Sequence, residues 1–162
     1  MSDLIEPSSD PLDALRGAAV AAIPIELAGQ RVLELGIGAG ATTRRLIAAH
    51  PKAEVVGLDS SGAMVFAARE LGIEVQLARM EDPLPDGPWD LVIAVLAVQC
   101  LDQTQIKALI RRVRGHSRAL VIGDRFDDGE QSVSLSAAAL ARSCDGALDW
   151  RDGSLAVVSA TY

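Results

Sequence analysis

A glycine-rich run at residues 34–40 is the part of this sequence best suited to holding a ligand. It reads ELGIGAG and follows a short apolar stretch. Glycine adopts positive φ angles and has no Cβ, so a ligand can closely approach the backbone of Gly36, Gly38 and Gly40. The helix expected to follow presents unpaired N–H groups and the positive end of its dipole. The run therefore predicts a ligand site where a strand passes into a helix.

The spacing of the run narrows the class of ligand. Dinucleotide sites favour G-x-G-x-x-G, with the pyrophosphate on the helix N-terminus, whereas this sequence has G-x-G-x-G. An acidic residue, Glu34, lies inside the strand end. A carboxylate there disfavours a diphosphate and suits a ligand that carries an ammonium group. A P-loop is excluded because no Gly-Lys-Ser/Thr follows the glycines.

A second candidate is Asp59, which closes the apolar stretch VVGL about 20 residues after the glycine run. A carboxylate at the end of the second strand can accept hydrogen bonds from both hydroxyls of a ribose. The alternative is that Asp59 caps a helix beginning at Ser61. Taken with the glycine run, the position favours ribose binding.

The elements that position these residues alternate between strand and helix. Apolar stretches bounded by turn residues predict seven strands, at 31–35, 53–58, 73–78, 89–96, 119–123, 147–151 and 155–160. Periodic segments predict helices at 40–50, 61–71, 103–114 and 131–143. This alternation predicts a Rossmann-like, doubly wound α/β fold with a mostly parallel sheet covered by helices on both faces. Ligands of such sheets bind beyond the carboxyl ends of the strands.

The two ends of the chain complete a single expected domain over residues 1–162. Residues 1–29 are predicted to form an arm and a helix, with Asp10 as N-cap and Pro11 at the first position. The last two strands are predicted to form an antiparallel hairpin around Asp152-Gly153.

Composition excludes several other classes of function. The net charge of −7 and the pI near 4.7 argue against a nucleic-acid partner. The longest apolar stretch, residues 91–98, is far shorter than the roughly 20 residues that a membrane helix needs. Cys100 and Cys144 have no metal-ligand spacing, so no metal site is predicted, and Cys100 is expected to be buried. The polar start, residues 1–10, does not resemble a signal peptide, and a cytoplasmic location is expected.

With these residues in place, the sequence resembles class I S-adenosylmethionine-dependent methyltransferases. Residues 32–45 and 55–59 resemble the first two motifs of that family, and residues 89–96 and 118–124 resemble its fourth and fifth strands. The resemblance implies S-adenosylmethionine as cofactor and methyl transfer to a small-molecule acceptor. The alternatives are an accessory protein that binds this cofactor without transfer, and a nicotinamide-dependent oxidoreductase.

The resemblance also implies a set of cofactor-binding residues. By position these are Glu34, Gly36, Ile37, Gly38, Gly40, Asp59, Ser60, Met64, Met80, Glu81 and Ala94. The sequence departs from the family at Arg79, where an acidic residue usually bonds the adenine amino group. The backbone of Met80 and the side chain of Glu81 are the alternatives for that contact.

No catalytic base is identified. The family often has a histidine near Gln99, but this chain has none there, and Asp124 and Arg125 are the best remaining polar candidates near an acceptor. The cations at residues 111–114 end a predicted helix, where they interact favourably with its dipole. Because the chain is short for the family, we expect an acceptor site that is open, or one completed by a second copy in a homodimer or by a partner subunit.

Overall fold

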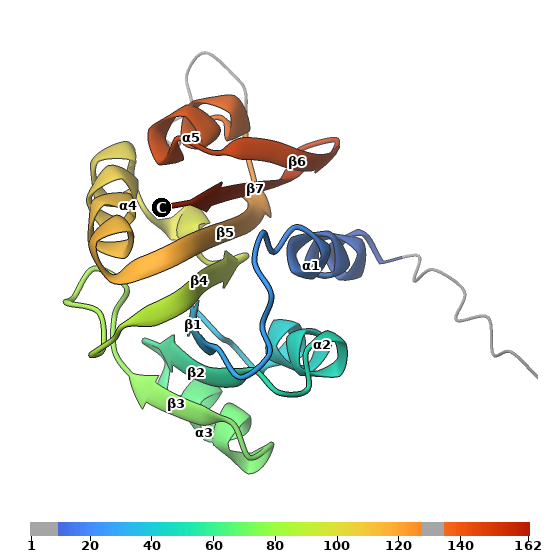
Figure 1. Ribbon diagram of the computed structural model, residues 1–162, viewed down its shortest axis with the longest axis vertical. Coiled ribbons are helices and arrows are strands. Elements are labelled where there is room, and N and C mark those ends of the chain that lie inside the picture. The colour runs from blue at the N-terminus through green and yellow to red at the C-terminus, as the bar shows by residue number, and fades with distance from the viewer. Residues whose placement is uncertain (1–9, 128–134) are drawn as a thin grey trace, which may run out of the picture.

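The computed structural model describes residues 10–127 and 135–162, which form one seven-stranded sheet in the order β3-β2-β1-β4-β5-β7-β6 (Figure 1). The strands are β1 (Arg31–Leu35), β2 (Glu54–Asp59), β3 (Glu74–Leu77), β4 (Trp89–Val95), β5 (Ser117–Arg125), β6 (Ala147–Asp152) and β7 (Leu155–Thr161). Strands β1 to β5 pair in parallel, whereas β7 pairs antiparallel with both β5 and β6. The predicted fold class is confirmed.

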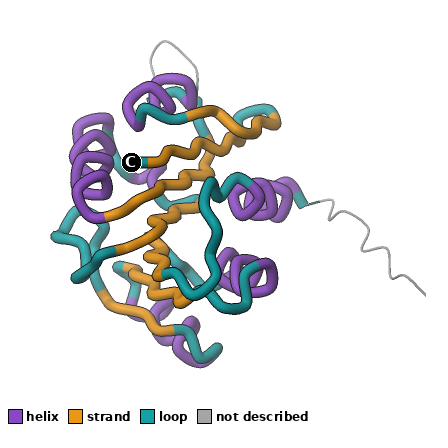
Figure 2. Tube along the Cα trace, viewed as in Figure 1, coloured by secondary structure: helices purple, strands orange, loops and turns teal. Residues whose placement is uncertain are grey.

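Helices cover both faces of this sheet (Figures 1 and 2). They are α1 (Pro11–Ala21), α2 (Ala41–Ala49), α3 (Gly62–Glu70), α4 (Gln103–His116) and α5 (Ala137–Cys144). The side chains of β4 show why two faces are needed, because they alternate between two apolar layers. Val92 packs with Leu109 of α4 and Leu140 of α5, while the flanking Leu91 and Ile93 pack with α1 and α2. The continuous apolar run that predicted β4 is thus buried on both sides.

The helix boundaries follow from capping chemistry. Asp10 accepts a hydrogen bond from the Leu12 amide at 3.0 Å, as its predicted role as N-cap of α1 requires. Asp102 and Gln105 form a reciprocal capping box at the start of α4. The predicted start of the last helix, at residue 131, lies outside the described residues, and α5 begins at Ala137 after the N-cap Ser136.

The C-terminal hairpin turns one residue later than predicted. Asp152 pairs with Leu155, so the two turn residues are Gly153 and Ser154 rather than Asp152 and Gly153. Gly153 has a φ of +57°, a left-handed conformation that glycine adopts without a steric penalty. The prediction misplaced the turn because an Asp-Gly pair suggests a different register from the one that the flanking strands adopt.

Candidate functional site

An open cleft of about 700 Å³ lies at the carboxyl ends of β1, β2, β3 and β4. Its lining residues come from the segments that follow these strands, and they are Gly36, Gly38, Leu58, Asp59, Ser60, Ala78, Arg79, Met80, Glu81, Leu96, Ala97 and Cys100. The parallel order of the sheet places all four strand ends on one edge, which is where open α/β sheets hold their ligands. The predicted location of the site therefore coincides with a cleft.

The glycines of the 34–40 run have separate structural reasons. A Cβ on Gly36 would lie 2.6 Å from the Cβ of Ala97, so glycine lets the β1 turn pack against the segment after β4. A Cβ on Gly40 would lie 2.7 Å from Cδ1 of Ile73, inside the protein. A Cβ on Gly38 would meet nothing within 4 Å, and Gly38 lines the cleft. Gly38 is therefore the glycine whose bare backbone faces the cleft.

Asp59 connects the end of β2 to this glycine turn. Its Oδ2 accepts a hydrogen bond from the Gly38 amide at 2.9 Å, and its Oδ1 accepts one from the Ser61 amide at 2.8 Å. The N-cap of α3 is Ser61, whose hydroxyl accepts from the Met64 amide, so the interpretation of Asp59 as the helix cap is wrong. The Asp59 side chain instead orders the residue that caps the helix and also lines the cleft. A carboxylate has about four acceptor sites, so two backbone bonds leave capacity for a ligand.

Glu34 lies outside the lining of the cleft. Its side chain is 1% exposed and accepts a short hydrogen bond from the Thr43 hydroxyl of α2. Burial raises the pKa of Glu34 to about 8, an effect that the Thr43 hydrogen bond only partly offsets. The carboxyl group is therefore mostly neutral near pH 7, which weakens the argument that it attracts an ammonium group. A role for Glu34 in cofactor binding stays a prediction.

Some of the predicted cofactor-binding residues line the cleft, and the others lie outside its lining. Ser60, Met80 and Glu81 line the cleft together with Gly36, Gly38 and Asp59. Ile37 is buried beneath α3, and Met64 lies on α3 with 41% of its side chain exposed. Neither of these two residues lines the cleft, and the same holds for Gly40 and Ala94. Ala94, on β4, is buried in the hydrophobic core.

The segment after β4 was not predicted as part of the site. Leu96, Ala97 and Cys100 line the cleft, and residues 98–100 form a short 3₁₀ helix. Cys100 is exposed, which corrects the expectation of a buried thiol. The apolar run misled because it continues past the strand end into the cleft wall. The predicted end of β4 is the signal that could have located this segment, since residues after a parallel strand lie at the ligand edge.

Asp124 holds this segment in place. Its side chain is fully buried, and Oδ2 accepts hydrogen bonds from the Val98 amide at 2.9 Å and the Gln99 amide at 3.1 Å. Oδ1 accepts from the Arg125 amide at 2.8 Å. Burial raises the pKa of Asp124, against the effect of these backbone bonds. Asp124 therefore positions the cleft wall, and neither it nor Arg125 lines the cleft.

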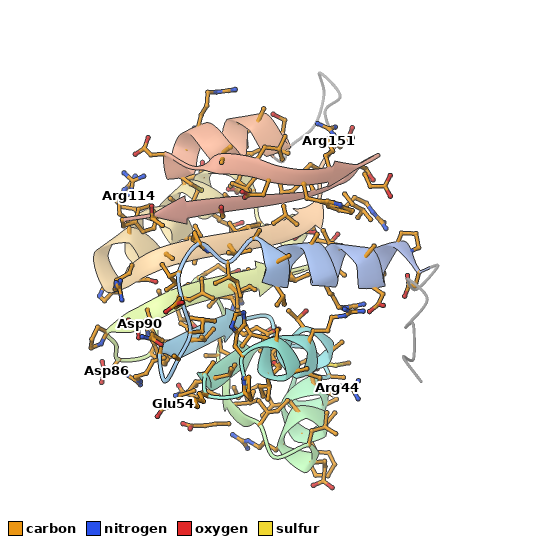
Figure 3. The ribbon with its side chains drawn as sticks, turned by 45° about the vertical axis from the view of Figure 1, so that its right-hand side comes forward. Arg44, Glu54, Asp86, Asp90, Arg114 and Arg151 are labelled. Atoms are coloured by element: carbon orange, nitrogen blue, oxygen red, sulfur yellow. The ribbon has the colours of Figure 1, made fainter. Side chains whose placement is uncertain are left out.

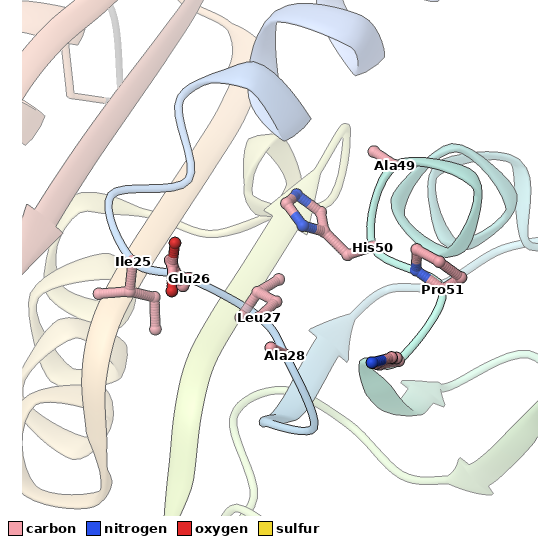
Figure 4. A pocket seen from close by; sticks show the side chains of 8 residues that line it. Ile25, Glu26, Leu27, Ala28, Ala49, His50 and Pro51 are labelled. Atoms are coloured by element: carbon pink, nitrogen blue, oxygen red, sulfur yellow. The ribbon is translucent and has the colours of Figure 1, made fainter.

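A second hollow lies at the opposite end of the strands (Figure 4). It has about 460 Å³ and is lined mainly by apolar side chains of residues 25–28 and 49–52. These residues precede β1 and β2, so they lie at the amino ends of the strands. His50 and Glu26 are among them, but no residue is shared with the cleft. This hollow does not contain the predicted site.

Comparison with known proteins agrees with this geometry. A family model described as a methyltransferase domain matches residues 32–119, from β1 into β5. The chain belongs to the methyltransferase domain family. The matched region of this methyltransferase domain contains the glycine turn, Asp59, the Arg79–Glu81 segment and the β4 end. It thus spans every residue that lines the cleft.

Two curated relatives are trans-aconitate 2-methyltransferases. One, from Azoarcus sp., is 34% identical over 114 residues, which cover 67% of this chain and 45% of that protein. The other, from Methylobacterium nodulans, is 36% identical over 84 residues, which cover 51% of this chain and 32% of that protein. The matches thus span less than half the length of these two relatives.

Solved structures share the fold at low sequence identity. A DhpI–SAM–HEP complex has a TM-score of 0.74 at 20% identity and covers 91% of this chain and 86% of that one. Human N-acetylserotonin methyltransferase in complex with SAM has a TM-score of 0.70 at 16% identity, covering 93% of this chain and 54% of that one.

Within residues 10–127 and 135–162, no helix is long and apolar enough to cross a membrane. The same residues contain no group of His, Cys, Asp and Glu side chains able to hold a metal ion.

Proposed function

We propose that this methyltransferase domain binds S-adenosylmethionine in the cleft and transfers its methyl group to a small-molecule acceptor. The observation that carries the proposal is the pairing of Gly38 and Asp59 at the ends of β1 and β2. The Gly38 amide lies 2.9 Å from Oδ2 of Asp59, so bare backbone and a carboxylate with free acceptor capacity are adjacent. Both residues lie in the region that matches the methyltransferase domain family. The curated relatives named as trans-aconitate methyltransferases support a small acceptor.

The residues that line the cleft fit the three parts of this cofactor. Gly38, where a Cβ would meet nothing within 4 Å, leaves room for the amino-acid portion to approach the backbone. Asp59 has acceptor capacity for the two sugar hydroxyls. Beyond the end of β3, Met80 offers an apolar side chain, and the carboxylate of Glu81 can accept a hydrogen bond from an amino group on the base.

Positioning accounts for the catalytic contribution that we assign to this chain. The cofactor, when bound, supplies a methyl group activated by a sulfonium centre. The chain holds donor and acceptor in line, and such alignment can contribute several kcal/mol to lowering a barrier (on the order of 7–11 at best). Leu96 and Ala97 form an apolar wall beside the glycine turn, and the buried Asp124 fixes that wall. Partial desolvation raises the pKa of the neighbouring Cys100 thiol.

Calorimetric titration with S-adenosylmethionine and S-adenosylhomocysteine tests binding. Asp59→Asn should weaken binding by about 1–3 kcal/mol, since it removes charged hydrogen-bond acceptors from the site. Asp90→Asn is the matched control. Asp90 also accepts a backbone hydrogen bond, from the Arg31 amide at 3.0 Å, but it lies at the amino end of β4 (Figure 3). Wild-type affinity in Asp59→Asn, or equal losses in both variants, would remove Asp59 from the cofactor site.

Turnover separates the enzyme from the accessory protein. Formation of S-adenosylhomocysteine is measured with trans-aconitate and a panel of small carboxylic acids as acceptors. Binding without product on any acceptor would favour the accessory role.

The cytoplasmic location and the homodimer or partner subunit stay predictions from the sequence. Light scattering tests the oligomeric state.

A further inference from the structure

A tight turn after β3 forms one wall of the cleft. The Asp82 amide donates to the Arg79 carbonyl at 3.1 Å, and the Arg79 amide donates to Oδ2 of Asp82 at 3.3 Å. Met80 and Glu81 occupy the centre of this turn, and both line the cleft. The orientation of the peptide groups at its centre therefore decides which polar atoms a ligand meets there.

Arg112 of α4 holds those central peptide groups from the protein side. Its Nη2 donates to the Met80 carbonyl at 2.8 Å, and its Nη1 donates to the Glu81 carbonyl at 2.9 Å. The planar fork of a guanidinium suits two neighbouring acceptors in a way that the point charge of a lysine does not. The Nε atom of Arg112 is buried, and it has no hydrogen-bond partner within the described part of the chain. Arg112 is thus committed to this turn at some cost in desolvation.

The neighbouring arginines do different work, so the helix-dipole interpretation of this run does not account for Arg112. Arg111 is exposed. Arg114, labelled in Figure 3, pairs with Asp145 at 2.8 Å, and its guanidinium lies over the ring of Tyr162. Arg112 alone among these three contacts the cleft wall in the described structure, and it reaches 31 and 32 residues back along the chain.

The position of the Met80 carbonyl also determines the direction of the next amide, that of Glu81, while the Glu81 side chain has a contact of its own. The Met80–Glu81 peptide is trans, so its N–H points away from its carbonyl and hence away from α4. The Glu81 side chain is held by Arg79, whose Nη2 lies 3.1 Å from Oε1. The hydrogen bond from Arg79 lowers the pKa of Glu81, and the nearby charge of Arg112 adds a smaller effect in the same direction. The turn thus offers an ionised acceptor beside the cleft.

We propose that Arg112 is a positioning residue that locks the Arg79–Asp82 turn so that Glu81 reads the base of the nucleoside ligand. The inference rests on the proposed function. Adenine carries an amino donor, which a carboxylate accepts. If the base carries a carbonyl group at that position, its oxygen faces the Glu81 carboxylate, and two acceptors cannot form a hydrogen bond. Without the guanidinium, the central peptides of the turn can rotate, and Glu81 loses its fixed place.

The test is ligand selectivity, measured by calorimetry. S-adenosylhomocysteine is compared with S-inosylhomocysteine, which has a carbonyl in place of the amino group. In the wild type we expect at least about tenfold tighter binding of the adenosyl ligand, the size expected for a hydrogen bond to a charged group. Arg112→Ala should bring this ratio close to 1, Arg112→Lys should give an intermediate ratio, and the exposed control Arg111→Ala should keep the wild-type ratio.

Each outcome decides one of the two proposals. A wild-type chain that binds neither ligand overturns the proposed function. A wild type that binds both equally, or an Arg112→Ala protein that keeps the wild-type ratio, overturns the role of Arg112. An equal loss of affinity for both ligands also counts against it, because general destabilisation would not alter selectivity. If Arg112→Ala does not fold, as judged by circular dichroism, the comparison rests on Arg112→Lys, where an unchanged ratio would overturn the inference.

Discussion

At the scale of single residues, Glu34 of β1 is a carboxyl group that the fold leaves only 1% exposed. Glu34 stands in the expected place, yet its side chain turns toward Thr43 and away from the cleft. In a strand, neighbouring side chains point to opposite faces. Leu33 and Leu35 pack toward α4 and α5, so Glu34 must point to the face covered by α1 and α2. Its buried carboxyl group is therefore a matter of stability first.

This burial gives the free energy of unfolding a defined pH dependence. The pKa of Glu34 is raised from 4.5 to about 8, so the native state keeps a proton that the unfolded chain has lost over that range. The unfolded state then binds fewer protons, and this group's contribution to the free energy of unfolding falls as pH rises, by at most about 1.4 kcal/mol per unit. Below 4.5 and above about 8 the group contributes no further change.

Glu34→Gln mimics the protonated form, so the variant should gain stability relative to the wild type as the pH is raised from 5 to 8. Urea unfolding followed by circular dichroism at each pH measures the difference. Glu54→Gln, at an exposed position labelled in Figure 3, is the control and should leave the pH dependence of the wild type unchanged. A Glu34→Gln curve parallel to that of the wild type would contradict a neutral buried Glu34.

Part of the site could be predicted residue by residue, and part could not. Gly38 and Asp59 were predicted because each belongs to a local motif that closes an apolar strand, although their contact spans 21 residues. Arg112 was not, because its two bonds reach carbonyls 31 and 32 residues away, and such contacts leave no local pattern. Cys100 was misplaced because hydropathy does not mark where a strand leaves the core.

At the scale of elements, the β4–α4 connection is an irregular wall of the cleft. Leu96 has a positive φ of 56°, which is uncommon for a residue with a side chain. The turn is held by the buried Asp124, on the neighbouring strand β5. The strands themselves could be predicted from their apolar runs, but this turn depends on a pairing between two strands that local sequence does not reveal.

Asp124 variants should therefore damage both stability and ligand binding. Asp124→Ala leaves three amides without their acceptor, two of them in the cleft wall, and should lower the free energy of unfolding by about 3 kcal/mol. Asp124→Asn keeps one oxygen acceptor and should cost about half as much. Chemical denaturation measures the stabilities, and calorimetry with S-adenosylhomocysteine measures the affinity.

The neighbouring Arg125→Ala, at an exposed position, serves as the control and should change neither stability nor affinity appreciably. If Asp124→Asn binds the ligand as tightly as the wild type, then Asp124 supports the fold without shaping the cleft.

At the scale of the whole molecule, one sheet separates two apolar layers and contributes side chains to both. Strand β5 links the parallel half to the antiparallel end, since it pairs with β4 on one side and with β7 on the other. The alternation of strands and helices predicted a mostly parallel sheet with an antiparallel hairpin at its end. It did not predict the order of the strands, in which β7 lies between β5 and β6. A shared sheet also gives a physical reason for the predicted single domain, which stays a prediction.

The two tryptophans of the chain can test that prediction, because they lie in different parts of the sheet. Trp89 is buried at the start of β4, and Trp150 lies on the edge strand β6. Trp150→Phe leaves Trp89 as the only reporter, and Trp89→Phe leaves Trp150. In a single cooperative domain, tryptophan fluorescence and far-ultraviolet circular dichroism should give the same urea midpoint within each variant.

A ligand that binds only the native state stabilises the entire cooperative unit. S-adenosylhomocysteine at 100 times its Kd should therefore add about 2.7 kcal/mol, whichever tryptophan reports. If the Trp150 signal were lost at lower urea and did not respond to the ligand, the antiparallel end would unfold separately from the cofactor-binding half. The chain would then comprise two units joined at β5.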